Sequence, residues 1–229
     1  MSTSPLIPEP LEHLPVLFQC HAYEMQKAHT RYEPDTPTWR IISLSMHILY
    51  LAATCHRKCH GGPHILEALA GRCYNLASAT CALLRICQYD EALSQIRSLG
   101  EIHNLLLLFI REPERIQVWI NADRRTRMRA FGPAAVRELL NDIDLPQVKG
   151  DWYSDLCERA VHIHPGTRPN KHSSDITAFI GPYYQEDGED EVVGELMQLT
   201  ATISMGICRW FKFDDLMGEM KRLIDEAKS

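Results

Sequence analysis

The stretch "YSDLCERAVHIH", residues 153–164, holds four side chains suited to proton-transfer chemistry: Tyr153, Arg159, His162 and His164. Its spacing is helical and a Pro/Gly turn follows it, so the histidines are predicted to lie at a helix end. A histidine near an arginine can transfer a proton and stabilise charge that develops on a phosphate oxygen. The alternative is structural: His162 bonds the free carbonyls of the helix end, and His164 orders the turn.

A second polar pair lies in "RSLGE", where Arg97 and Glu101 are four residues apart and share one face of the predicted helix. Apolar residues flank this face, so we expect the pair to be partly buried and to frame a site. An ordinary surface ion pair is the alternative. Gly100 costs about 1 kcal/mol relative to alanine inside a helix. Its presence there indicates that another group approaches closely.

The segment "DRRTRMR", residues 123–129, is a local basic run in an acidic chain. The chain has 24 basic and 30 acidic residues and a net charge of −6, and "QEDGEDE", 185–191, is an acidic run. No global basic field therefore indicates nucleic acid. The local run is either a solvated face or a set of phosphate contacts. Its candidate nucleic-acid-binding residues are Arg124, Arg125, Arg127 and Arg129.

The segment "CHRKCHGGPH" contains potential metal ligands: Cys55, Cys59, His60 and His64. Two thiolates and an imidazole can hold Zn²⁺, but a structural site usually needs four well-placed ligands. A single cysteine pair four residues apart on a helix is not a usual zinc spacing. The sequence therefore predicts no metal, with a zinc-stabilised regulator as the weaker alternative, and it predicts no cofactor. It lacks Walker, Rossmann, HExxH and GxSxG patterns, which disfavours the common nucleotide hydrolases, dehydrogenases and zinc proteases.

Helical periodicity runs through almost the whole chain. It predicts an all-α fold: one domain over 1–229, built as an elaborated bundle of about eight helices. The best-defined helix spans 89–112, and another runs over 113–131. Further helices are expected over 151–163 and 189–211, with a loop or short hairpin near 165–188.

No secretory signal opens the sequence, and its longest apolar run, residues 105–110, is far shorter than the roughly 20 residues of a membrane span. The eight cysteines lie mostly in apolar helical patterns, where thiols behave as small hydrophobic groups. We therefore expect a cytoplasmic protein with reduced cysteines and no membrane partner.

Two segments together resemble a known family. "YDEALSQIRSLGEIHNLLLLF…EPERIQVW" followed by "VRELL" and "WYSDLCERAVHIHPGT" is similar to an uncharacterised all-helical bacterial family with R-S-x-x-E and Y-x-x-L-S-x-x-x-H motifs. The resemblance covers about residues 85–170, and Cys157 stands where the family has a serine. The second motif is in turn similar to the HEPN superfamily. Many of its helical bundles are ribonucleases of toxin–antitoxin and phage-defence systems.

The HEPN motif R-N-x-x-x-H can be aligned here in two ways. If His162 matches the family histidine, Cys157 occupies the arginine position and the standard site is decayed or rebuilt. If His164 matches, Arg159 lies five residues upstream, as the motif requires, but Ala160 replaces the usual polar residue. The second alignment implies a metal-independent ribonuclease with His164 as acid or base and Arg159 at the phosphate.

Two functions follow from these observations. The resemblance implies a HEPN-like ribonuclease acting on RNA, with its site formed across a homodimer interface and the run 123–129 gripping phosphates. The alternative is a non-catalytic helical module that binds a protein or nucleic acid partner. In that case Arg97, Glu101, Tyr153 and His162 form a structural polar network. The enzyme requires Arg97, Glu101, Arg159 and either His162 or His164 to converge on an open cleft.

Overall fold

The computed structural model describes residues 13–29, 33–59, 61, 64–141, 147–162 and 181–228. These residues form ten α-helices and one π-helical turn, and no strand occurs among them. The all-α prediction is thus confirmed, with more helices than the eight expected. Most of the predicted loop or hairpin near 165–188 lies outside the described residues, as do His60 and His164.

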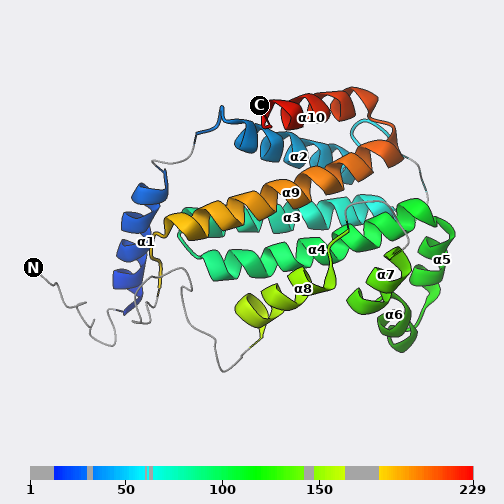
Figure 1. The fold of residues 1–229 in the computed structure, drawn as a ribbon, viewed down its shortest axis with the longest axis horizontal. Coiled ribbons are helices and arrows are strands. Elements are labelled where there is room, and N and C mark those ends of the chain that lie inside the picture. Colours follow the sequence, from blue (N-terminus) through cyan, green and yellow to red (C-terminus); the bar gives the residue numbers. More distant parts are fainter. Residues whose placement is uncertain are drawn as a thin grey trace, which may run out of the picture.

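Four long helices form the central bundle: α2 (Pro37–Ala53), α3 (Ile65–Arg85), α4 (Tyr89–Arg111) and α9 (Glu186–Phe211). The connection from α3 to α4 is only three residues long, so these helices run antiparallel, as Figure 1 shows. Helix α4 packs against both α3 and α9, which places it at the centre of the molecule. Of the α4 side chains only Glu91 and Arg111 are exposed, so most of this helix is covered by neighbouring elements.

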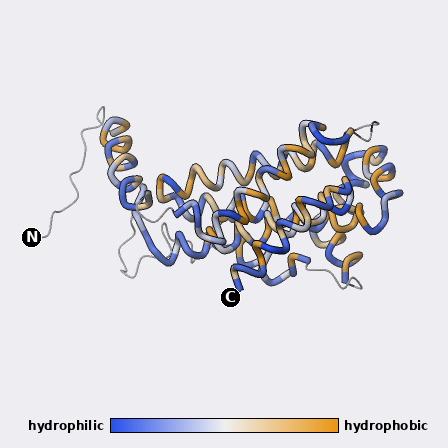
Figure 2. Tube along the Cα trace, turned by 90° about the horizontal axis from the view of Figure 1, so that it is seen from above, coloured by the Kyte–Doolittle hydropathy of each residue, from blue (hydrophilic) through white to orange (hydrophobic). Residues whose placement is uncertain are grey.

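The core is built from the apolar faces of these four helices. Its largest fully buried side chains include Tyr89, Phe109 and Phe211. Small residues face each other where α2 and α9 pack. Buried Ser204 of α9 donates a hydrogen bond to the carbonyl of Ser45 on α2 at 3.2 Å, which shows how closely the two helices approach. Figure 2 shows hydrophobic and hydrophilic residues alternating along these helices, the pattern expected of helices with one buried face.

Two further helices cover the bundle. Helix α10 (Asp214–Glu226) packs on α2 and α9, whereas α1 (His13–His29) stands across one end of the bundle and contacts α3 (Figure 1). In the part of the chain that the structure describes, no helix combines the length and the apolar character needed to cross a membrane.

The predicted helix over 113–131 is wrong, because two helices meet there at a corner. Helix α5 (Glu114–Asn121) ends where Ala122 becomes extended, and α6 (Arg124–Phe131) begins after Asp123. The Asp123 carboxylate accepts the backbone N–H of Thr126 at 2.8 Å, which is the side-chain cap expected at a helix start. Helix α7 (Pro133–Leu140) then folds back onto α4 and α6.

Helix α8 (Gly150–Leu156) packs against α4 and continues into the π-helical turn Cys157–Val161. Trp152 fixes this contact, because a Cβ atom at position 100 would lie only 2.7 Å and 2.9 Å from two of its ring carbons. The close approach predicted at Gly100 is therefore confirmed. Buried Asn104 adds two 2.8 Å hydrogen bonds to the backbone of Val148. Together these contacts place α8 in a defined position beside α4.

Candidate functional site

Tyr153 is the centre of a polar cluster between α4 and α8. Its hydroxyl donates a hydrogen bond to Glu101 at 2.7 Å and accepts one from the Arg97 guanidinium. Arg97 and Glu101 are also paired directly at 2.8 Å, and Arg97 Nε donates to the Cys157 thiol sulfur at 3.2 Å. The side chains of Arg97 and Glu101 are 19% and 31% exposed, so the partial burial predicted for this pair is confirmed.

The cluster changes the acidity of two of its members. Burial, together with the hydrogen bond to the Glu101 carboxylate, raises the pKa of Tyr153 to about 12, although Arg97 acts in the opposite direction. Burial alone would lower the pKa of Arg97, but Cys157, Glu101 and Tyr153 outweigh it, and the net direction is upward. Tyr153 is thus held neutral and Arg97 cationic at neutral pH. This state suits a structural network and opposes proton transfer by the tyrosine.

A second arginine, Arg137 of α7, approaches the same ring. The guanidinium carbons of Arg97 and Arg137 lie 4.7 Å and 4.6 Å from the centre of the Tyr153 ring, within the range of cation–π attraction. In the described part of the chain, Arg137 has no carboxylate partner. Sequence analysis did not select Arg137, which lies in "VRELL". Its partner is the ring of Tyr153, which is distant in sequence, so no local spacing indicated the contact.

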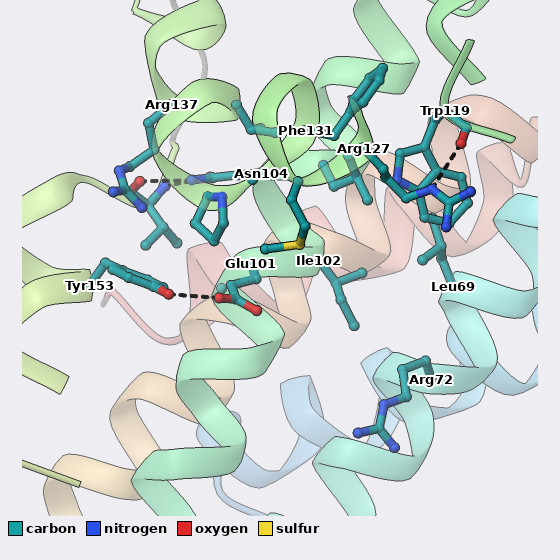
Figure 3. Close-up of a pocket in the computed structure, with 17 residues that line it drawn as sticks. Leu69, Arg72, Glu101, Ile102, Asn104, Trp119, Arg127, Phe131, Arg137 and Tyr153 are labelled. Atoms are coloured by element: carbon teal, nitrogen blue, oxygen red, sulfur yellow. Dashed lines mark hydrogen bonds between the residues drawn. The ribbon is translucent and has the colours of Figure 1, made fainter. Parts of the chain in front are cut away.

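A cavity of about 420 Å³ opens beside this cluster, between α4 and the α5–α7 corner (Figure 3). Tyr153, Glu101 and Arg137 lie on one side of it, and aromatic or apolar side chains form most of the remainder. Arg72 of α3 and Arg127 of α6 also reach its wall. The apolar part consists of Leu69, Ile102, Leu105, Trp119, Met128, Phe131, Val136 and Val148.

Arg159 belongs to a different cluster from Arg97. It pairs with Asp155 at 2.8 Å and with Glu191 of α9 at 2.7 Å, so two carboxylates offset its charge. Beside it, Glu195 accepts a hydrogen bond from the Trp152 ring at 2.9 Å. Burial and the repulsion of Glu191 raise the pKa of Glu195, against the effect of the hydrogen bond from Trp152. These contacts fasten α8 and the π turn to α9.

His162 ends the π-helical turn with an exposed side chain, and its backbone N–H bonds to the Cys157 carbonyl at 2.7 Å. Across the residues that the structure covers, its imidazole makes no hydrogen bond or ion pair. No hydrogen bond or ion pair therefore joins the His162 imidazole to Arg97, Glu101 or Arg159 in the structure. The candidate base His164 lies outside the described residues.

The four arginines of the basic run fall into two groups. Arg127 turns inward and bonds the end of α5, donating to the carbonyls of Trp119 at 3.1 Å and Ala122 at 2.6 Å. It also lies over the Trp119 ring, 5.5 Å from its centre. The other three are exposed and have no ion-pair partner within the ranges described: Arg124, Arg125 and Arg129.

Comparison with known protein families, with curated proteins and with solved structures finds no match to this chain.

Proposed function

We propose that this chain is a non-catalytic helical module, built on a HEPN-like bundle, that binds single-stranded RNA through α6 and the adjoining cavity. The division of its arginines carries the proposal. Arg97 and Arg159 are occupied by carboxylates of the same chain, whereas Arg124, Arg125 and Arg129 are exposed and without ion-pair partners in the described ranges. Exposed arginines clustered on one helix favour contacts to phosphates.

The spacing of the α6 residues supports a single binding face. Positions 125 and 129 are one helical turn apart, and so are positions 124 and 128, so the four side chains lie on one side of α6, within an arc of about 140°. Met128 is 65% exposed on this face and also lines the cavity. The face thus leads into a cavity lined by the half-buried ring of Trp119 and the buried ring of Phe131, so Trp119 is the aromatic surface on offer. Single strands bind by this combination of backbone cations and aromatic surfaces for bases.

The proposal is tested by the salt dependence of RNA binding. Binding of a fluorescent mixed-sequence single strand is followed by anisotropy, with wild type and an Arg124→Gln/Arg125→Gln/Arg129→Gln variant. Three phosphate contacts on a single strand give a log–log slope with salt of about −2, because each contributes about −0.7. The variant should lose that part of the slope and bind at least tenfold more weakly.

The matched control removes three exposed cations elsewhere, as Arg85→Gln/Arg209→Gln/Lys221→Gln on α3, α9 and α10. It has the same net charge as the α6 variant and should keep both the wild-type affinity and the wild-type salt slope. Equal losses of RNA affinity and salt slope in the two variants would mean that binding depends on net charge alone. That result would overturn the assignment of the binding face to α6. No binding by folded wild type would overturn the proposal itself.

A second candidate, metal-independent ribonuclease, is favoured by one observation. The exposed His162 directly follows a π-helical turn, and such turns occur frequently at functional sites. The test is cleavage of labelled RNA in EDTA by wild type, His162→Ala and His164→Ala. Cutting that a histidine substitution abolishes would establish the enzyme, and binding without cutting supports the module. The homodimer that the resemblance implies is tested by sedimentation of the same preparation.

A further inference from the structure

The connection between α2 and α3 brings two cysteines and a histidine together. The sulfurs of Cys55 and Cys59 and a ring nitrogen of His64 all lie within 4.8 Å of one another, and Cys55 Sγ is 3.6 Å from His64 Nδ1. With Zn–S and Zn–N bonds of about 2.3 Å and 2.05 Å, a tetrahedral site has an S···N edge of about 3.5 Å. This pair of atoms is therefore at the spacing that one shared metal ion imposes.

The backbone takes unusual conformations to achieve this arrangement. Among the described residues other than glycine, only four have a positive φ, and two of them are Cys55 (52°) and His64 (48°). A left-handed residue just after a helix, as at Cys55, is a common way to end it. His64 occupies the N-cap of α3, where an extended conformation is normal. Its left-handed conformation is thus an outlier of the kind that concentrates at ligand sites.

The surroundings of the three side chains suit a bound cation. The backbone N–H of Gly61 points to the Cys59 sulfur at 3.4 Å, where it stabilises negative charge on the thiolate. The Glu67 carboxylate, from the first turn of α3, lies 3.6 Å from His64 Nδ1, and Glu67 is only 7% exposed. A buried carboxylate beside the ligands adds negative charge that favours a metal cation.

We propose that Cys55, Cys59 and His64 bind a thiophilic divalent metal ion of the zinc class, with water in the fourth position. Each cysteine thiol loses its proton to solvent as its sulfur coordinates the ion, so binding releases up to two protons. Cys59 and His64 are exposed, which leaves one side of the ion open to water. The bound ion clips the end of α2 to the start of α3.

The sequence-based expectation of no metal rested on two grounds: the cysteine pair was expected on a helix, and a structural site usually needs four well-placed ligands. Helix α2 ends at Ala53, so Cys55 and Cys59 lie in the non-helical connection that follows it and not one turn apart on a helix. In this connection the four-residue spacing lets both sulfurs face one point. The expectation is therefore revised in favour of a site with three protein ligands.

The first test is cobalt binding to the full chain, kept reduced with a phosphine and titrated with Co²⁺. We expect one equivalent to bind, with the intense visible bands of tetrahedral cobalt and a thiolate-to-cobalt charge-transfer band. Added Zn²⁺ should abolish these bands. Cys55→Ser and Cys59→Ser should remove the charge-transfer band or weaken binding at least tenfold. Cys20→Ser, which changes an exposed cysteine of α1, should behave as wild type.

A second readout is thermal stability with and without Zn²⁺. Zinc should raise the melting temperature of wild type and of Cys20→Ser, because an ion that binds only the folded state stabilises that state. The melting temperature of Cys59→Ser should stay unchanged, because this variant lacks a ligand. Cys59 is exposed, so its substitution is compatible with folding. Absence of cobalt bands in the reduced wild type would overturn the proposal. Bands that persist in a Cys55→Ser/Cys59→Ser double variant would do the same.

Discussion

A single hydroxyl, that of Tyr153, joins a cation and an anion that already face each other on α4. It accepts from Arg97 and donates to Glu101, so every member of the cluster has a partner. Such a fully bonded network stabilises the position of α8, because removal of one member leaves partly buried polar groups unpaired. At this scale the observed contacts favour a structural role for residues whose types also suit catalysis.

The acidity of Tyr153 gives a prediction about stability and pH. The pKa of Tyr153 is about 12 in the folded protein and about 10 in an unfolded chain. Folding therefore favours the protonated tyrosine, and this contribution is complete below about pH 10 and disappears as the pH rises to about 12. Tyr153→Phe should reduce the free energy of unfolding by about 1–2 kcal/mol at neutral pH. The difference from wild type should shrink between about pH 10 and about pH 12.

Urea unfolding at a series of pH values measures this difference. Tyr50→Phe is the control, because Tyr50 is 46% exposed on α2, and its difference from wild type should stay small throughout. A difference for Tyr153→Phe that does not change above about pH 10 would mean that the tyrosine ionises alike in both states.

At the scale of elements, the contact between α4 and α8 depends on the missing side chain of Gly100. Alanine normally stabilises a helix relative to glycine by about 1 kcal/mol. At position 100, however, the added Cβ meets the rigid Trp152 ring at 2.7 Å, and overpacking of this kind costs about 1–3 kcal/mol. We expect Gly100→Ala to lower the free energy of unfolding by about 1–2 kcal/mol and to shift the tryptophan fluorescence.

Gly194→Ala supplies the matched control in α9, where a Cβ atom would have nothing within 4 Å. Here only helix propensity acts, so the variant should gain about 0.5–1 kcal/mol in urea unfolding. Stabilisation by both substitutions would show that Trp152 moves aside easily and that α8 is not fixed by this contact.

The corner between α5 and α6 gives a prediction about Arg127. Its guanidinium bonds carbonyls at the end of α5, and Arg127→Gln should leave them without these donors, at a cost of about 1–3 kcal/mol. Arg125→Gln, on the same helix but exposed, should change stability by less than about 0.5 kcal/mol. Thermal unfolding compares the two. If both variants were equally stable, Arg127 would be free to join the other arginines in binding phosphate.

Sequence periodicity predicted the long helices well and the corners poorly. The range 89–112 agrees with α4, because a sustained apolar stripe defines a helix that packs along its whole length. The break at Asp123 was missed although aspartate is a favoured N-cap, because no proline or glycine marks it between Pro113 and Phe131. The pair Arg97 and Glu101 was found from local spacing. Arg137 was not, because long-range packing places its side chain over the Tyr153 ring. The close approach of Cys55 to His64 was not either, because it depends on left-handed backbone conformations at both residues.

At the scale of the whole molecule, the acidic and the basic run lie at opposite ends of the bundle. The acidic run 185–191 starts α9 at the end of the bundle beside α1, whereas α6 lies at the opposite end (Figure 1). The net charge of −6 would repel RNA, but the Debye length is only about 8 Å at physiological salt. A polyanion that contacts α6 therefore responds to charges near that helix and hardly to those at the far end.

This separation predicts different effects on RNA affinity for two equal changes in net charge. Asp123 lies at the start of α6, and the hydrogen bond from the Thr126 backbone, aided by Arg129, keeps the pKa of its carboxyl low. Asp123→Asn retains a good helix cap while removing a negative charge beside the arginines. It should strengthen RNA binding about threefold at low salt, the effect of one unit charge at about 6 Å in water.

Asp187→Asn makes the same change of charge in the exposed first turn of α9, and it should leave RNA affinity unchanged at any salt concentration. Anisotropy titrations at low and high salt compare the two variants, and the gain at Asp123 should vanish at high salt because screening removes it. An equal gain in both variants would mean that RNA responds to net charge alone. A gain at Asp187 only would move the binding face away from α6 to the α9 end of the bundle.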